Sequence, residues 1–217
     1  MTKEFHNEID QLKARVLHMA DQARLNLVEG VRSLVDGDAA LARRVIQREE
    51  ELNRLDVEIE AEALSLLALN QPMAADLRTI GASLKVITYI DRIGRYGYDI
   101  AKATLELGDQ KLPRKPLAFN LMAEKAMEMY DRAIEAYKER DAAKARGVAA
   151  MDEVVDTLYD QIFRQAITYM MEDPRTITLH AHHILVARHL ERTGDNARKI
   201  AEKALYMASG ERRLPLR

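Results

Sequence analysis

Cysteine is absent from this chain of 217 residues, and its absence excludes disulfide bonds and metal sites built on thiolates. The lack of cysteine alone does not determine the compartment. A large excess of one charge is missing too, because 33 basic and 35 acidic residues leave a formal net charge of −2. So small a net charge gives no electrostatic reason to expect binding to nucleic acid.

Long apolar runs are also missing. No stretch of about 18 consecutive apolar residues occurs, and the first residues show no apolar core of a signal peptide. We therefore expect a cytoplasmic protein that does not span the membrane. Hydrophobic residues make up 47% of the chain and charged residues 31%, which is enough for a sizeable core and a soluble surface.

Proline is scarce, and its five positions separate long spans that contain none. Because proline breaks helix interiors, these spans predict uninterrupted helices. Apolar residues recur in them at helical spacing, as at Phe5, Ile9 and Leu12. Asp36-Gly37-Asp38 predicts a helix end and offers Asp38 as the next N-cap. We expect helices over roughly residues 5–35, 38–70, 74–107, 117–140, 141–171 and 175–208.

The two halves of the chain repeat each other. Residues 38–45 match residues 141–148, and Pro72 matches Pro174. Residues 108–116 form the only stretch that reads as a linker. Duplication of a three-helix unit explains the pattern, and it predicts an all-α fold of two tandem antiparallel three-helix bundles. We place the first bundle at residues 1–110 and the second at residues 111–217.

The second unit contains two pairs of carboxylates one helical turn apart: Asp152 with Asp156, and Glu191 with Asp195. Like charges so placed repel each other by a few tenths of a kcal/mol on an exposed helix. If the two helices turn back near Asp173, Asp156 and Glu191 each lie about 25 Å from that turn and Asp152 is level with Asp195, so the four carboxylates converge. An all-oxygen cluster suits Mg²⁺, Ca²⁺, Mn²⁺ or iron, and Zn²⁺ is possible.

The alternative is that these acids form solvated helix faces and pair with Arg188, Arg192 or Arg198. Glycine recurs inside the predicted helices, at Gly94 and Gly194, at a cost of about 1 kcal/mol each relative to alanine. Close helix packing is the explanation we favour for both, and room for a metal cluster is the other.

The first unit carries an altered copy of the carboxylate motif. Its four positions hold Glu49, Asn53, Asp91 and Arg95, so one acid is replaced by an amide and another by a guanidinium. Arg95 can therefore replace a cation with an internal salt bridge, and Asp99 can extend that ion pair. We expect the first unit to bind metal weakly or not at all.

Four histidines cluster on the last predicted helix, but no Glu-x-x-His element of di-iron bundles accompanies them. We interpret them as ordinary surface or core residues, with His183, near the turn, as the first exception to consider. The four are His180, His182, His183 and His189. The chain has no glycine-rich phosphate loop, no Ser/His/Asp arrangement and no zincin motif, so nothing in it points to catalysis.

The stretch Glu191-Arg192-Thr193-Gly194-Asp195-Asn196-Ala197, taken with residues 170–177, resembles the PhoU family. Residues 71–78 and 91–94 fit the same family, and the resemblance covers nearly the whole chain. It implies two three-helix bundles side by side, with acid-x-x-x-acid motifs that bind multinuclear iron or zinc clusters in some members. By position, Asp152, Asp156, Glu191 and Asp195 match these motifs in the second unit. Glu49 and Asp91 match in the first, where Asn53 and Arg95 depart from the pattern.

The resemblance also implies a function. The implied function is that of a non-enzymatic, cytoplasmic regulator acting between a phosphate ABC transporter and a sensor histidine kinase. Such a regulator represses the phosphate-starvation response when phosphate is plentiful. Exposed apolar helix faces commonly drive such bundles to dimerise, so we expect a homodimer. Two alternatives stay open: a metal-dependent hydrolase that acts through metal-bound water, and a scaffold whose acids serve only solubility.

Overall fold

The computed structural model describes residues 3–108 and 118–211. Within these two ranges every regular element is a helix and no strand occurs, which confirms the all-α prediction. No helix in the described part of the chain is long and apolar enough to cross a membrane. Except for Gly108, the linker expected at residues 108–116 lies outside the described residues.

The first unit consists of three long helices: α1 (Lys3–Asp36), α2 (Ala39–Asn70) and α3 (Ala74–Leu107). Their bounds agree closely with the predicted ones because the signals at the helix ends are local. Asp38 is the N-cap of α2, and its carboxylate accepts a hydrogen bond from the backbone N–H of Leu41 at 2.9 Å.

The second unit repeats this layout with one interruption. Its helices are α4 (Phe119–Glu139), α5 (Ala142–Val148), α6 (Asp152–Glu172) and α7 (Ile177–Ser209), with short 3₁₀ turns η1 (Ala149–Met151) and η2 (Pro174–Thr176). The prediction of one unbroken helix over residues 141–171 is therefore wrong at η1. Gly147 lies just before this point, and glycine weakens a helix by about 1 kcal/mol relative to alanine.

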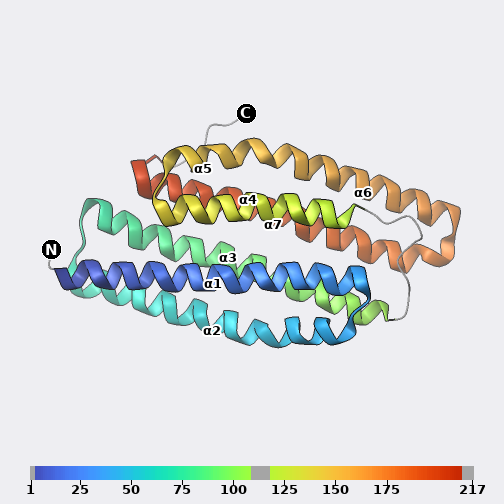
Figure 1. Ribbon diagram of the computed structural model, residues 1–217, viewed down its shortest axis with the longest axis horizontal. Helices are drawn as coiled ribbons and strands as arrows, with labels where there is room; N and C mark the ends of the chain where they lie inside the picture. Colours follow the sequence, from blue (N-terminus) through green and yellow to red (C-terminus); the bar gives the residue numbers. More distant parts are fainter. Residues whose placement is uncertain (1–2, 109–117, 212–217) are drawn as a thin grey trace.

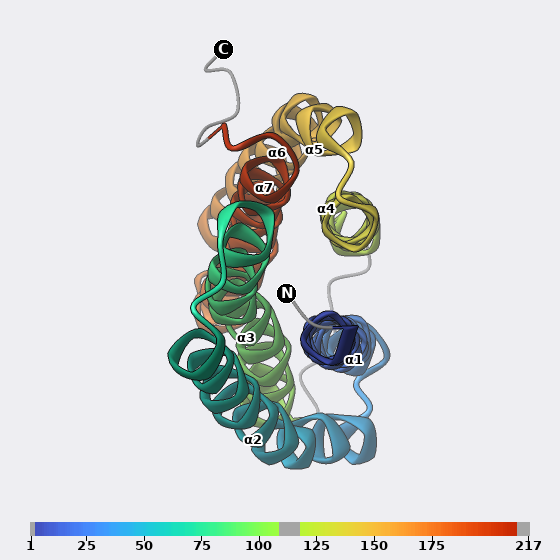
Figure 2. The same cartoon turned by 90° about the vertical axis from the view of Figure 1, so that its left-hand side faces the viewer.

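The helices form two layers (Figures 1 and 2). α2, α3, α7 and α6 line up in one layer, while α1 and α4 lie side by side on its face. α3 of the first unit packs along α7 of the second, and the two run antiparallel, since Tyr96 contacts Asn196 whereas Glu106 contacts His182. The α2–α3 and α6–α7 hairpins consequently point to opposite ends of the molecule (Figure 1).

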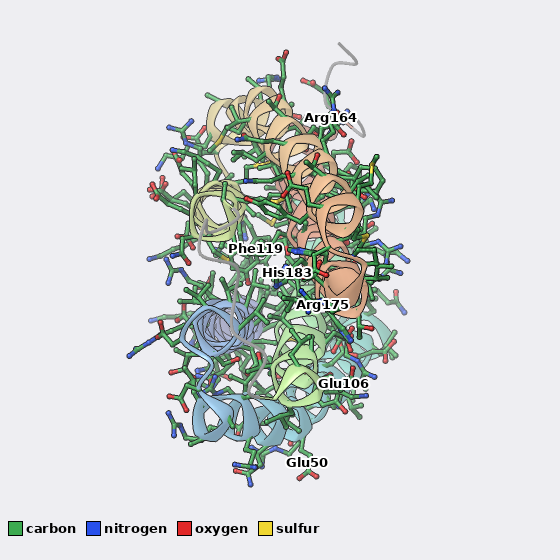
Figure 3. All side chains as sticks on the ribbon, turned by 90° about the vertical axis from the view of Figure 1, so that its right-hand side faces the viewer. Glu50, Glu106, Phe119, Arg164, Arg175 and His183 are labelled. Atoms are coloured by element: carbon green, nitrogen blue, oxygen red, sulfur yellow. The ribbon has the colours of Figure 1, made fainter. Side chains whose placement is uncertain are left out.

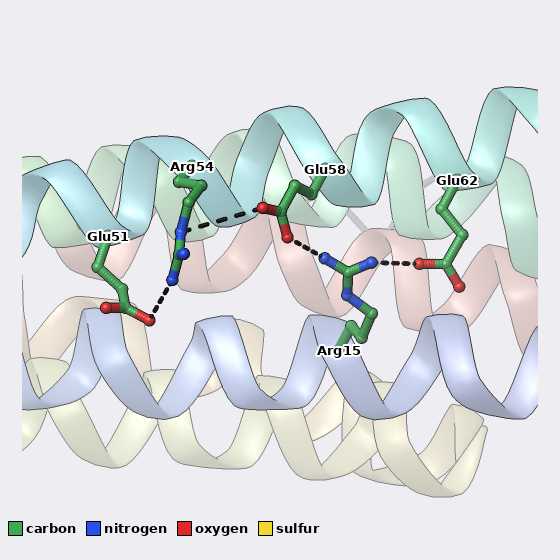
Figure 4. Close-up of polar contacts among 5 residues, drawn as sticks. All are labelled: Arg15, Glu51, Arg54, Glu58 and Glu62. Carbon is green, nitrogen blue, oxygen red and sulfur yellow. Dashed lines mark hydrogen bonds and ion pairs between the residues drawn. The ribbon is translucent and has the colours of Figure 1, made fainter.

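Polar groups set the register between helices at a few positions. The Tyr130 hydroxyl on α4 donates to the Ala20 carbonyl on α1 at 2.9 Å, which ties the two units together. On the surface, Arg15 of α1 bridges to Glu58 and Glu62 of α2 (Figure 4). Exposed ion pairs of this kind contribute about 0–1 kcal/mol each, so burial of the apolar helix faces holds the bundles together.

Candidate carboxylate site and family

The carboxylate of Glu191 on α7 is the centre of the second-unit cluster. Its Oε1 accepts a hydrogen bond from Arg188 at 3.0 Å, whereas its Oε2 is buried without a hydrogen-bond partner. Burial raises the pKa of Glu191, and the charges of Asp195 and Asp156 raise it further. The structure thus places two of the other predicted carboxylates, Asp195 and Asp156, close enough to Glu191 for their charges to act on it.

The fourth carboxylate, Asp152, lies at the start of α6 and faces the same stretch of α7. Its Oδ2 is 3.5 Å from Arg198, and its Oδ1 lies beside Gly194, where a Cβ atom would stand 3.7 Å away. The same Cβ would stand 3.3 Å from the sulfur of Met129. Of the three nearest atoms only the end of the flexible Met129 side chain is tight, so packing favours glycine at position 194 without requiring it.

Arginines already neutralise part of this cluster, as in the alternative interpretation of the acidic pairs. Arg188 pairs with Glu191 and Arg198 pairs with Asp152. Among the described residues, no three histidine, aspartate or glutamate side chains stand in positions that could hold a metal ion. The like charges and the orphaned Oε2 of Glu191 fit a cation, which would compete with Arg188 and Arg198 for these carboxylates.

In the altered copy of the first unit, the Arg95 side chain supplies the positive charge. Arg95 lies 3.3 Å from Oε1 of Glu49, which is only 6% exposed, so the internal salt bridge predicted from the sequence is present. Arg95 also lies 3.9 Å from Asp99 and over the ring of Tyr98. Burial raises the pKa of Glu49, and the charge of Arg95 opposes that rise.

Asp91 is half-buried, which raises its pKa, while the charges of Arg95 and Arg92 lower it. Asn53, the amide of the altered copy, is exposed. The charge of Asp91 also raises the pKa of Glu49, and sequence reasoning missed a second acid that approaches Asp91. It is Asp56, whose pKa is raised by burial and then by the charge of Asp91.

Asp56 follows Glu49 by two helical turns and so lies on the same face of α2. That spacing could have identified Asp56 as a member of the acidic cluster. The repeat matches Asp56 with Tyr159, however, so comparison of the two halves did not reveal it.

The histidines of α7 divide into two pairs. His180 and His183 are buried, with their Nδ1 atoms 3.2 Å apart, and the ring of Phe119 packs edge-on against His183 (Figure 3). Burial lowers the pKa of His183 to about 4, so this ring is neutral near pH 7. The other two face α3, where His182 lies 3.9 Å from Glu106 and the ring of His189 packs against Tyr96.

Comparison with known protein families decides the assignment. The PhoU domain matches the chain twice, over residues 16–104 and 119–204, which is one copy in each three-helix unit. The chain belongs to the PhoU family. Two PhoU homologues are named phosphate-specific transport system accessory proteins. The one from Rhizobium meliloti is 37% identical over 95% of this chain and 87% of its own length, and one from Caulobacter vibrioides is 36% identical over 96% and 91%.

Solved PhoU structures share the fold. The crystal structure of PhoU from Pseudomonas aeruginosa has a TM-score of 0.90 at 32% identity, and the match covers 95% of this chain and 99% of that one. The phosphate transport system regulatory protein PhoU from Streptococcus pneumoniae gives 0.89 at 25% identity, over 98% and 100%. The predicted pair of three-helix bundles is thereby confirmed.

Proposed function

We propose that this protein is a non-enzymatic regulator of phosphate uptake and of the phosphate-starvation response. One observation carries the proposal: PhoU domains occupy both units, and relatives matched over most of their length are named accessory proteins of phosphate-specific transport. In this proposal the protein is cytoplasmic and forms a homodimer. It acts as an adaptor between a phosphate ABC transporter and a sensor histidine kinase.

The proposal includes one metal site, formed in the second unit by Asp152, Asp156, Glu191 and Asp195. The orphaned oxygen of Glu191 and the clustered like charges support it, because a cation would relieve their repulsion. Iron or zinc is favoured by the family resemblance, and Mg²⁺, Mn²⁺ or Ca²⁺ also suit oxygen ligands. Glu49 and Asp91 of the first unit bind no metal in this proposal, because Arg95 supplies the opposing charge.

Deletion of the gene tests the regulatory role. In a phosphate-rich medium, the deletion strain should express phosphate-scavenging genes that the parent strain represses, and a plasmid copy should restore repression. Affinity purification from phosphate-replete cells should recover a transporter subunit or a sensor kinase. An unchanged phosphate response, in a strain without a second copy of the gene, would refute the proposal.

A phosphatase screen tests the non-enzymatic part. Purified protein supplied with Mn²⁺ or Zn²⁺ should release no phosphate above the rate of the metal alone. Activity that disappears in the Asp156→Ala, Asp195→Ala variant would instead support the hydrolase alternative.

A further inference from the structure

An arginine and a tyrosine lie directly beside the second-unit carboxylates. On α7, Arg188 precedes Glu191 by three residues, and on α6, Tyr159 follows Asp156 by three residues. A spacing of three residues keeps two side chains on one face of a helix. Because α6 and α7 form an antiparallel hairpin, the two faces meet in reverse order (Figure 1). Arg188 consequently lies over Tyr159, just as the charge of Asp156 acts on Glu191.

The guanidinium of Arg188 lies between two groups that both attract a cation. Its Nη1 donates to Oε1 of Glu191 at 3.0 Å, and its Cζ lies 5.8 Å from the centre of the Tyr159 ring. Because an aromatic ring attracts a cation within about 6 Å, the second contact is at the limit of its range. The side chain of Arg188 is 44% exposed, whereas that of Glu191 is 15% exposed. The arginine therefore has room to turn towards the ring, while Glu191 is held in the cluster.

Arg188 satisfies only one oxygen of the carboxylate that it binds. Oε2 of Glu191 is buried without a hydrogen-bond partner, and the charges of Asp195 and Asp156 repel the same carboxylate. A pairing through both oxygens would be the stronger one for an arginine. The single hydrogen bond therefore leaves part of the repulsion uncompensated, and a divalent cation would compensate more of it in competition with Arg188.

The first unit contains the same three kinds of group in a fixed form. Arg95 lies 3.3 Å from Glu49, and its Cζ lies 4.7 Å from the centre of the Tyr98 ring. There the arginine takes the place of a motif acid, so its charge is part of the motif itself. In the second unit the motif keeps all four acids, and Arg188 comes from one turn before it on α7. A cation can therefore displace Arg188 and still meet the complete set of acids.

We propose that Arg188 is a displaceable counter-ion of the second-unit site, which holds Glu191 until a divalent cation competes for it and then turns onto the ring of Tyr159. This inference rests on the proposed metal site and adds how the affinity of that site is set. Because a guanidinium keeps its charge throughout the physiological pH range, the competition does not relax as pH changes. Arg188 lowers the metal affinity of the site, and Tyr159 limits how far it is lowered.

Calorimetric titration of the purified full-length protein with Mn²⁺, and separately with Zn²⁺, tests the proposal. Arg188→Gln should bind the metal about tenfold more tightly than the wild type, because the change removes both a competing ion pair and the repulsion of one positive charge. Arg188→Lys keeps the charge and should stay within about threefold of the wild type. Binding that remains in the double variant Asp156→Ala, Asp195→Ala belongs to other parts of the chain and is subtracted.

Arg54→Gln is the matched control. Arg54 pairs with Glu51, three residues away, at 3.1 Å, so this change also removes one positive charge from a glutamate, but in the first unit. Its metal affinity should equal that of the wild type. Tyr159→Leu should weaken metal binding about threefold in the wild type and leave it unchanged in the Arg188→Gln background. Tyr159→Phe keeps the ring and should change neither affinity.

Equal metal affinities of the wild type and Arg188→Gln would overturn the proposal and leave the metal site intact. So would an equal effect of Tyr159→Leu in both backgrounds, since the tyrosine would then act without the arginine. Absence of binding to the wild type and to Arg188→Gln alike would overturn both the proposal and the metal site. These assays use purified protein, so their failure is distinct from an unchanged phosphate response in the deletion strain.

Discussion

Replacement of Gly97 by alanine should destabilise the protein, although alanine is the better helix former. Gly97 on α3 faces Gly30 on α1, where the two helix backbones touch. A Cβ at position 97 would stand 2.7 Å from the backbone nitrogen of Leu27 and closer still to the carbonyl oxygen of Asn26. Because these obstacles are backbone atoms, no rotamer change can relieve the clash.

The magnitude follows from two opposing effects. Alanine gains about 1 kcal/mol over glycine in a helix interior. Heavy atoms need about 3.5–4.0 Å of separation, so α1 and α3 must move apart by about 1 Å, and overpacking of this kind costs about 1–3 kcal/mol. With rigid backbone on both sides we expect the upper end of that range, and hence a net loss of about 2 kcal/mol.

Gly81→Ala is the matched control on the same helix. A Cβ at Gly81 would meet nothing within 4 Å, so only the gain in helix propensity remains, and the variant should be more stable by about 1 kcal/mol. Urea unfolding followed by circular dichroism measures both changes. With a slope of about 2 kcal/mol/M, Gly97→Ala should lower the midpoint by about 1 M. A Gly97→Ala midpoint at or above that of the wild type would refute the packing argument.

Two further predictions concern charge. Elemental analysis should find no bound metal in the double variant Asp156→Ala, Asp195→Ala, and a nearly unchanged metal content in Asp91→Ala. Arg95→Asp should raise the metal-to-protein ratio. Equal metal losses from Asp91→Ala and Asp195→Ala would contradict the asymmetry between the units. The folded state lowers the pKa of His183 to about 4 from its usual value near 6.5, so the unfolded chain takes up the proton first and stability is lost as pH falls from 6.5 towards 4. His183→Leu should therefore lose less stability than the wild type between pH 7 and pH 5, and an equal loss in both would contradict the burial argument.

Helix positions were predictable because their signals act within a few residues. Apolar spacing, scarce proline and the Asp38 cap depend on neighbours one turn away, and the structure follows them closely in α1, α2 and α3. The duplication was visible for the same reason, since matching positions can be compared without coordinates. An internal salt bridge of Arg95 also followed from sequence, because the repeat puts a guanidinium where the second unit has an acid, and the structure shows that its partner is Glu49.

Only the tertiary structure decided how these helices face one another. The contact of Gly30 with Gly97, the approach of Asp56 to Asp91 and the burial of His183 each depend on how a helix is rotated about its axis, to within a fraction of a turn. The contact between α1 and α4 depends on the packing of one unit against the other. Periodicity shows that a helix has an apolar face, but the separation of side chains on different helices is determined by how all the helices fill a common core.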